Sequence, residues 1–217
     1  MLSRPRALDL FCGAGGASLG LFRAGFDVWG VDIKPQPNYP FRFIQDDALR
    51  FPFFGKKSTV KFDLVWASPP CQAYTKAQRI RNNNHQDLIG EIREKLQKWQ
   101  QQGEYWVIEN VPSSPLRHPI ELCGTMFGLG TYRHRWFESS LPLEQPPHKK
   151  HTTKTTKMGR KPVSGEFIHV VGNFSGVRKA RSAMGIGWMT RDELKEAVPP
   201  AYSEYIGSRI YEYALAA

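Results

Sequence analysis

Residues 9–16 read Asp9-Leu10-Phe11-Cys12-Gly13-Ala14-Gly15-Gly16, and this stretch decides the fold class. The apolar run from Ala7 to Phe11 predicts a buried strand. The glycines after it predict a tight turn, which opens a helix running to about Ala24. A glycine-rich turn at the carboxyl end of a first strand lets the backbone pass close to a ligand. The stretch therefore favours a nucleotide-like cofactor site, with a plain tight turn as the alternative.

The chain beyond this turn alternates short apolar runs with helical or loop stretches, which is typical of a parallel sheet with crossover helices. Apolar residues recur at helical spacing from Leu88 to Trp99. Thr190-Arg191-Asp192-Glu193 has the pattern of a capping box, and Pro199-Pro200 opens a last helix to about Tyr213. We expect further strands at residues 26–32, 62–67, 105–109 and 167–171. The sequence thus predicts an α/β fold with a mostly parallel sheet and helices on both faces.

The composition excludes several classes of protein. Of 217 residues, 41% are hydrophobic and 23% charged, so a collagen-like, low-complexity or wholly disordered chain is excluded. No stretch approaches the roughly 18 apolar residues of a membrane span, and the residues after Met1 lack the apolar core of a signal peptide. Three cysteines, too few for a disulfide scaffold, indicate free thiols in a reducing compartment. We therefore expect a folded cytoplasmic protein with no contact with membranes.

The charge balance favours a polyanionic partner. The 30 Lys and Arg residues exceed the 20 Asp and Glu residues, so the net charge is +10. A basic surface without such a partner is the alternative. Basic residues are dense from His148 to Lys161, a segment without any Asp or Glu. We expect this segment, called the basic segment below, to be an exposed loop that contacts nucleic acid.

Acidic residues follow two of the early apolar runs. Asp32 ends the predicted second strand, where a carboxylate can accept hydrogen bonds from both ribose hydroxyls of an adenosine. Asp46 and Asp47 follow the apolar segment from Phe41 to Ile44 and could place an acid near an adenine amino group. Either could instead be a turn carboxylate.

Two residues at strand ends suit covalent chemistry on a ring. Cys71 follows Ser68-Pro69-Pro70, and the prolines stop the strand and present the thiol at the carboxyl edge of the sheet. Glu109 ends a run of apolar residues, and burial should raise its pKa enough for it to act as an acid toward a ring nitrogen. Cys12 and Cys123 are interpreted as small buried apolar residues. Further along, Arg133 and Arg135 alternate, as on one face of a strand.

In its order of motifs the chain resembles the cytosine-C5 DNA methyltransferases that use S-adenosylmethionine. The resemblance covers Asp9 to about Phe137 and, weakly, the C-terminal helix. It implies the Rossmann-like methyltransferase fold. The implied cofactor residues are Phe11, Gly13, Gly15, Asp32, Asp47 and Pro70, and the implied catalytic residues are Cys71, Glu109, Arg133 and Arg135.

This resemblance implies a mechanism. The Cys71 thiolate would add to carbon 6 of a flipped-out cytosine while Glu109 acts on N3, so that carbon 5 can accept the methyl group. Arg135 would contact O2 of the base and steady Glu109. We expect nucleic-acid contacts from Gln72, Lys76, Arg79, Arg81, Lys154, Lys157 and Arg160.

The resemblance also implies an organisation in three parts. Residues 1–144 would form the catalytic core, 145–180 a reduced target-recognition insert, and 181–217 the closing helices. Gly207-Ser208 and Gly172-Asn173 are both candidates for the Gly-Asn pair that the family carries before its last helix. We expect a monomer without a bound metal ion, acting on DNA as in restriction–modification.

Three other functions remain open. A relative within the family methylates transfer RNA and also has Ser-Pro-Pro-Cys-Gln, so RNA is the first alternative substrate. Methylation of exocyclic amines is disfavoured because those enzymes carry an aromatic residue where this chain has Cys71. A catalytically inert DNA-binding protein is disfavoured because Cys71, Glu109 and both arginines are intact.

Overall fold

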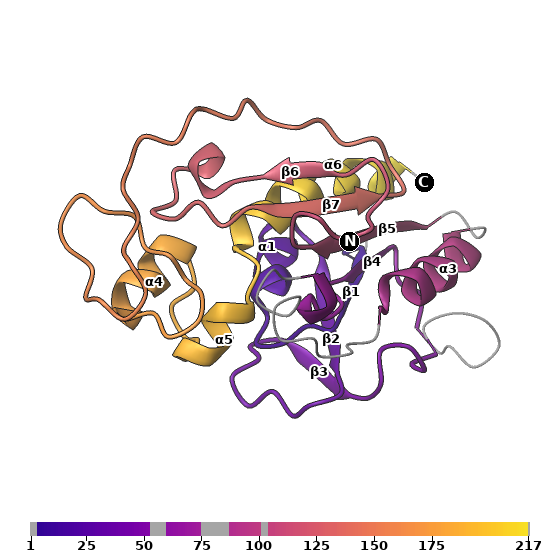
Figure 1. The fold of residues 1–217 in the computed structure, drawn as a ribbon. Helices are drawn as coiled ribbons and strands as arrows, with labels where there is room; N and C mark the ends of the chain where they lie inside the picture. Colours follow the sequence, from indigo (N-terminus) through magenta and orange to yellow (C-terminus); the bar gives the residue numbers. More distant parts are fainter. Residues whose placement is uncertain (1–3, 53–59, 75–86, 101–103, 217) are drawn as a thin grey trace.

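The computed structural model describes residues 4–52, 60–74, 87–100 and 104–216, and Figure 1 shows their arrangement. The strands are β1 (Arg6–Leu10), β2 (Asp27–Asp32), β3 (Arg42–Gln45), β4 (Leu64–Ala67), β5 (Tyr105–Asn110), β6 (Ile120–Leu122) and β7 (Arg135–Ser139). The α-helices are α1 (Gly16–Arg23), α3 (Ile89–Gln100), α4 (Val177–Met184), α5 (Arg191–Glu196) and α6 (Pro200–Ala216), and short 3₁₀ turns cover Gln72–Tyr74 and Gly124–Phe127. In this part of the chain no helix is both long and apolar enough to cross a membrane.

The described strands form one seven-stranded sheet in the order β3-β2-β1-β4-β5-β7-β6. The pairs from β3 to β5 are all parallel, whereas β7 runs antiparallel to both β5 and β6. The chain therefore has a Rossmann-like α/β fold, as predicted. In such a sheet the strand order reverses beside β1, and ligands bind outside the carboxyl ends of the strands at this point.

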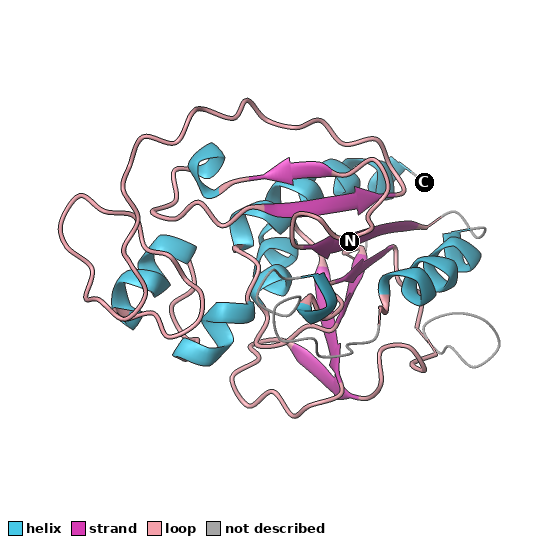
Figure 2. Cartoon of the chain, in the orientation of Figure 1, coloured by secondary structure: helices cyan, strands magenta, loops and turns pink. Residues whose placement is uncertain are grey.

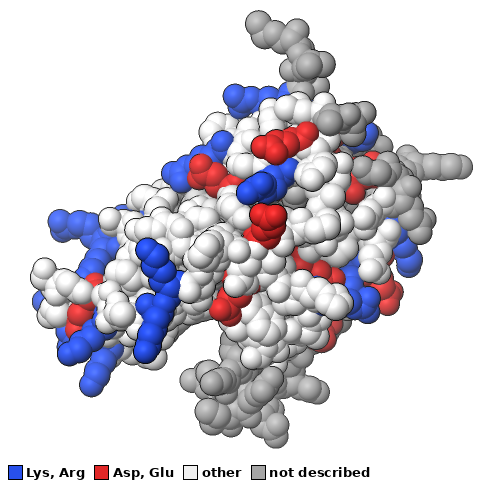
Figure 3. All heavy atoms as spheres, turned by 90° about the horizontal axis from the view of Figure 1, so that it is seen from above, with Lys and Arg blue, Asp and Glu red and all other residues white. Residues whose placement is uncertain are grey.

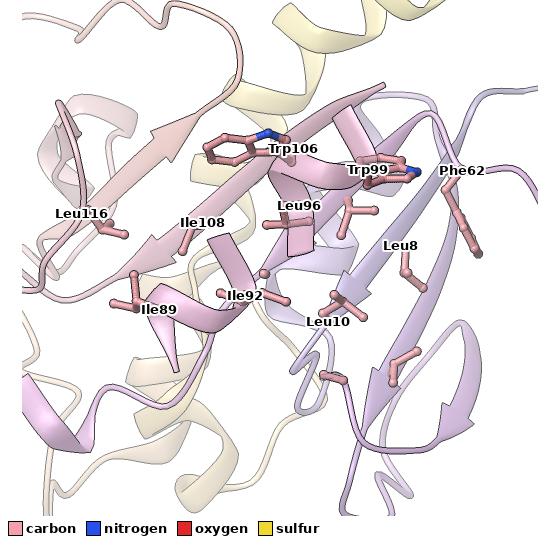
Figure 4. Packing of buried hydrophobic residues seen from close by; sticks show 14 residues of the cluster. Leu8, Leu10, Phe62, Ile89, Ile92, Leu96, Trp99, Trp106, Ile108 and Leu116 are labelled. Atoms are coloured by element: carbon pink, nitrogen blue, oxygen red, sulfur yellow. The ribbon is translucent and has the colours of Figure 1, made fainter. Parts of the chain in front are cut away.

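Helices cover both faces of the sheet. On one face α3 packs Ile92, Leu96 and Trp99 against Leu8 and other side chains of the sheet, and all of them are buried (Figure 4). The other face carries α1 and α6, whose buried apolar side chains form a second cluster.

The two helices on that second face approach closely because α1 contains glycine. A Cβ atom at Gly20 would lie 2.1 Å from the backbone oxygen of Pro200, at the start of α6. The Ser203 hydroxyl donates to the Ala17 carbonyl at 2.8 Å, which holds the same crossing. Gly207 also serves this packing, since a Cβ there would meet Ala24 and Leu21 at 3.1 Å.

Most of the predicted elements are present with small shifts of their ends. The capping box at Thr190 is confirmed: its hydroxyl oxygen accepts from the Glu193 N–H at 3.4 Å, and Glu193 accepts from the Thr190 N–H at 2.6 Å. The predicted strand at residues 167–171 is wrong. Phe167 forms only an isolated bridge with Thr155, and the next N–H, of Ile168, bonds to the Gly130 carbonyl instead of to a neighbouring strand.

A third hydrophobic cluster joins the irregular part of the chain to the C-terminal helices. It contains Ile168, Val170 and Phe174, side chains of α4 and α5, and Ala14 of the glycine turn. Figure 2 shows the chain between β7 and α4 as loop. The cluster has members on both sides of residue 180, and the proposed division at that position stays a prediction.

Candidate active site

Two neighbouring parallel strands bring Cys71 and Glu109 to one edge of the sheet. Ala67, the last residue of β4, pairs with Ile108 of β5, and β5 continues only to Asn110, so the carboxyl ends of both strands lie at the same edge of the sheet. The Asn110 side chain links the two ends, because its Nδ2 donates to the Pro69 carbonyl at 2.9 Å. Asn110 thus fixes the loop that carries Cys71, a positioning role that sequence reasoning missed.

The Glu109 carboxyl is buried and ion-paired. Only 5% of the residue is exposed, and Arg135 Nε lies 2.9 Å from Glu109 Oε1. Burial raises the pKa of Glu109, and the positive charge of Arg135 opposes this rise without cancelling it. This direction of the pKa shift agrees with the prediction from the apolar strand.

The Cys71 thiol is partly exposed at the end of β4. Burial of its surroundings raises its pKa, while the cations of Arg135 and Arg133 lower it. The arginines therefore stabilise the thiolate, which is the nucleophilic form. Because the same Arg135 charge acts on Glu109 and Cys71, the three groups are electrostatically coupled.

Arg133 and Arg135 do not lie on one strand face as predicted, because β7 begins only at Arg135 and Arg133 has a positive φ of 30°. The buried Arg133 guanidinium donates to three backbone carbonyls, those of Val170 (2.9 Å), Lys195 (2.7 Å) and Ala197 (2.8 Å). Burial lowers its pKa to about 9. Its side chain thus joins the sheet edge that carries Glu109 to the C-terminal part of the chain.

The glycine turn after β1 is shaped for close approach of a ligand. Gly13 and Gly15 have positive φ angles of 48° and 86°, and so does Phe11 at 60°. A Cβ at Gly13 would meet nothing within 4 Å, so the turn leaves open space beside its backbone. Asp32 Oδ2 accepts from the Gly13 N–H at 3.0 Å, which brings the predicted ribose-binding carboxylate to the turn.

Other parts of the chain support this turn. Trp188, which is distant in sequence, donates from Nε1 to the Ala14 carbonyl at 3.0 Å. Below the turn, Asp9 is fully buried and accepts a hydrogen bond from the Ser18 hydroxyl, which also contacts Tyr39 at 2.8 Å. Burial raises the pKa of Asp9 to about 7, and its Oδ1 has no partner among the described residues. Sequence reasoning missed these supports.

Asp47, the predicted adenine-contacting residue, lies in a turn after β3. Its Oδ1 accepts from the Leu49 N–H at 2.9 Å, and its Oδ2 lies 3.5 Å from Arg50 Nε. The N–H of the neighbouring Asp46 donates to the Asp32 carbonyl at 3.1 Å, so Asp47 is one residue away from a backbone contact with Asp32. Asp47 therefore has the local bonds of a turn carboxylate and a place near Asp32.

A cavity of about 420 Å³ lies beside the two arginines. One wall is the segment from Thr131 to Arg135, and another is the segment from Ile168 to Val171. Arg135 lines this cavity and also binds Glu109, so the cavity and the buried acid are neighbours. The volume is within the range of pockets that hold small molecules.

Basic side chains gather at the left in Figure 3, the end of the molecule where Figure 1 shows α4 and the irregular segments. Lys154 and Lys157 are exposed in the basic segment, as predicted. Arg160 instead forms an ion pair in which its Nη2 lies 2.7 and 2.6 Å from the Glu166 carboxylate oxygens. Gln72 lies in the 3₁₀ turn after Cys71, whereas Lys76, Arg79 and Arg81 fall outside the described residues.

Comparisons with known proteins agree on one family. The model of the family described as C-5 cytosine-specific DNA methylase matches residues 6–115. The Type II methyltransferase M.XorII of Xanthomonas oryzae pv. oryzae is 31% identical over 127 residues, which are 51% of this chain and 29% of that protein. The Type II methyltransferase M1.HphI of Haemophilus parahaemolyticus is 32% identical over 123 residues, or 48% and 32% of the two chains. The aligned parts thus span about a third of these relatives.

Solved structures share the fold over nearly the whole chain. A candidate DNA modification methyltransferase encoded within a prophage (E. coli) has a TM-score of 0.66 at 16% identity, with 98% of this chain and 100% of that chain covered. The S. pombe Dnmt2 methyltransferase has a TM-score of 0.59 at 13% identity, with 97% and 99% covered. At these identities the likeness concerns the fold alone.

Proposed function

Because the chain belongs to the C-5 cytosine-specific DNA methylase family, we propose that it transfers a methyl group from S-adenosylmethionine to carbon 5 of cytosine in DNA. One observation carries the proposal most directly. A buried acid, Glu109, lies at the end of the strand next to Cys71 and is held by an arginine that also lines a cavity. This arrangement supplies a nucleophile and an acid to one planar ring.

The Cys71 thiolate begins the proposed reaction by adding to carbon 6 of the cytosine. A bond forms between sulfur and carbon 6, and the C5–C6 double bond gives up its electron pair. Glu109 donates its proton to N3 at the same time, so the ring becomes a neutral enamine that is nucleophilic at carbon 5. The raised pKa of Glu109 supports this role, because a proton must be present on the carboxyl group before the addition.

The residues around the glycine turn fit the cofactor. The open space beside Gly13 admits a ligand against the backbone, and Asp32 is placed to accept hydrogen bonds from ribose hydroxyls. S-adenosylmethionine, when bound, would supply the methyl group: the bond from its positively charged sulfur to the methyl would break as carbon 5 gains the methyl, and the sulfur would leave as a neutral thioether. Phe11, Gly15, Asp47 and Pro70 complete the proposed set of cofactor residues.

The last stage returns the ring and the enzyme to their starting states. A water molecule removes the proton from carbon 5, the electron pair restores the C5–C6 double bond, and the Cys71 thiolate leaves. The proton on N3 returns to Glu109. Arg135 is proposed to contact the base and to hold Glu109 in place, whereas Arg133 acts as a positioning residue through the carbonyls that it binds.

DNA is proposed as the substrate, and the target base would leave the helix to reach Cys71. Lys154 and Lys157 offer exposed charges for phosphate contacts beside the cavity. Residues 145–180 are too few for a large recognition domain, so we expect a very short recognition site. Participation in a restriction–modification system belongs to this proposal and rests on the names of the relatives.

Trapping of the covalent intermediate tests the proposed function. In a long duplex whose cytosines are replaced by 5-fluorocytosine, carbon 5 has no proton to lose, so the adduct with Cys71 should persist. Denaturing electrophoresis in the presence of S-adenosylmethionine should show a protein–DNA adduct, and peptide mapping should place it on Cys71. The Cys71→Ser protein should form none while still binding S-adenosylmethionine, because the glycine turn is unchanged.

Two outcomes would contradict this proposal. An adduct formed by the Cys71→Ser protein would exclude Cys71 as the nucleophile. An adduct with RNA that contains 5-fluorocytosine, together with none on DNA, would assign the chain to RNA substrates instead.

A further inference from the structure

Four potential metal ligands meet next to the cavity beside Arg133 and Arg135, and two of them, His134 and His151, also line that cavity. They are Cys123, in the turn after β6, His134, just before β7, and His148 and His151 of the basic segment. One ligand atom from each residue lies within 4.8 Å of those from the other three. Cys123 is buried, His134 is half-buried, and the other two histidines are exposed. None of the four has a role in the methyl-transfer chemistry proposed above.

Two pairs of ligand atoms in the cluster lie close to the separations of a tetrahedral coordination shell. His148 Nε2 lies 2.9 Å from His151 Nε2, and Cys123 Sγ lies 3.4 Å from His151 Nε2. Bond lengths of about 2.05 Å to nitrogen and 2.3 Å to sulfur give a tetrahedron whose edges are about 3.3 Å (N–N) and 3.6 Å (S–N). These two separations differ from the tetrahedral edges by only a few tenths of an ångström, and the remaining ligand atoms lie within 4.8 Å of one another.

Neighbouring side chains hold the ligands in place. The Tyr132 ring stacks on the His151 ring with a centroid distance of 3.6 Å and an angle of 14°. The Tyr132 hydroxyl in turn accepts from the Thr153 N–H at 2.9 Å and donates to its carbonyl at 2.7 Å. Glu121 Oε1 lies 3.8 Å from His134 Nε2 and adds negative charge beside the cluster.

We propose that Cys123, His134, His148 and His151 bind one Zn²⁺ ion as a tetrahedral structural site. Four protein ligands fill the coordination shell, so the ion has no open position for catalysis. A thiolate with three imidazoles selects zinc over Mg²⁺ or Ca²⁺, which take oxygen ligands. Binding converts the Cys123 thiol to a thiolate, and its proton passes to the solvent.

The site would tie the basic segment to the active-site edge. His134 lies between Arg133 and Arg135, so its ligation would fix the backbone that carries both arginines. His148 and His151 lie at the start of the basic segment, which would be anchored there to β6 and β7. This proposal departs from the expectation of a chain without a bound metal ion. Only His148 and His151 are close in sequence, and Cys123 was interpreted as an apolar residue, so the sequence alone did not indicate the site.

Direct measurement of bound zinc tests the proposal. The purified chain is incubated with excess ZnCl₂ and passed through gel filtration, and the zinc that remains bound is measured with a chromogenic chelator. We expect the chain to retain one Zn²⁺ ion. After incubation with MgCl₂ it should retain no Mg²⁺. With Co²⁺ in place of zinc, the visible absorption spectrum should be that of tetrahedral coordination with a thiolate ligand. Zinc should also raise the Tm of the chain, since an ion that binds only the folded state stabilises it.

Exposed histidines provide variants that should keep the fold. His148→Ala should weaken zinc binding at least about tenfold, which is the smallest effect usual for loss of a group that supports a metal. The combined His148→Ala and His151→Ala protein should retain no zinc. His118→Ala, which replaces an exposed histidine outside the cluster, should bind one equivalent. Failure of the parent chain to retain zinc, or equal retention by the double variant, would overturn the proposal, and neither result bears on methyl transfer.

Discussion

The sheet edge that carries Cys71 and Glu109 and the basic segment are positioned by different kinds of contact. At the edge, Cys71 follows β4 and Glu109 lies near the end of the parallel strand β5, whose hydrogen bonds fix the backbone, and Asn110 ties the two strand ends together. The basic segment contains no helix and no strand beyond a single bridge at Thr155. A few individual hydrogen bonds locate it, such as those between the Tyr132 hydroxyl and Thr153.

This difference matches the demands of the two proposed tasks. Covalent chemistry on a ring needs groups that keep their geometry within fractions of an ångström, and a buried sheet edge provides that. Contacts to phosphates tolerate variation, because a lysine is a flexible point charge. The comparison predicts that changes at the sheet edge alter the rate of methyl transfer and that changes in the basic segment alter the affinity for DNA. Changes at Arg133, which joins the two regions, should alter the stability of the fold.

The largest effect is expected at the edge, for Glu109→Gln. The amide has nearly the same shape but cannot deliver a proton to N3, so the single-turnover rate of methyl transfer should fall by roughly 10²-fold or more. The affinity for DNA should change little, because the carboxyl group acts in the transition state. Rapid-quench measurement at saturating cofactor and DNA gives the rate, and a filter-binding titration gives the affinity.

A control separates chemistry from folding in this experiment. Glu104→Gln changes a second buried glutamate, located just before β5 rather than at its carboxyl end. It should leave the single-turnover rate unchanged. If Glu109→Gln weakened DNA binding while the rate constant stayed the same, the edge would not be the site of proton transfer.

The next effect concerns Arg133, which joins the two regions. Arg133→Ala would leave the carbonyls of Val170, Lys195 and Ala197 without their donor. Since one buried group without a partner costs about 1–3 kcal/mol, the free energy of unfolding should fall by about 3 kcal/mol. Urea denaturation measures the change, with Arg178→Ala at an exposed position of α4 as the control. A change below about 0.5 kcal/mol, the usual range for surface substitutions, would mean that Arg133 does not join the regions.

The parts of the fold that follow local rules were predictable from the sequence. The glycine turn, the first strands, α3 and the capping box at Thr190 depend on residues close together in the chain, and all are present. The same holds for the placement of Cys71 and Glu109, because parallel strands put their carboxyl ends at one edge. The raised pKa of Glu109 followed from the apolar strand that carries it.

The parts that depend on distant contacts were not predictable. Residues 167–171 have the composition of a strand, but the Gly130 carbonyl and the Arg133 guanidinium take backbone groups that a strand would use. The partners of Arg133 lie 37 to 64 positions further along the chain. Trp188 supports the glycine turn from 174 positions away. No pattern in the sequence links such residues, because the spacing rules describe only local structure.

The smallest effect is expected in the basic segment, for the combined change of Lys154→Ala and Lys157→Ala. Both side chains are exposed, so the change should not affect the fold. If they contact phosphates, binding should weaken on every DNA sequence alike, and the slope of log K against log salt should flatten by up to roughly 0.9 per lost contact. The rate constant at saturating DNA should match that of the parent chain.

The positions that are methylated decide between two roles for these lysines. Phosphate contact carries no sequence information, so bisulfite sequencing of a methylation-free host should show the same modified cytosines for the variant and the parent. Direct reading of bases would instead change the modified positions and leave the salt slope nearly unchanged. A flexible ammonium group lacks the planar fork that recognises a base edge through two bonds, and this favours phosphate contact. If the variant methylates different cytosines while the slope of log K against log salt stays the same, the basic segment reads bases. The two regions would then not divide chemistry and phosphate contact between them.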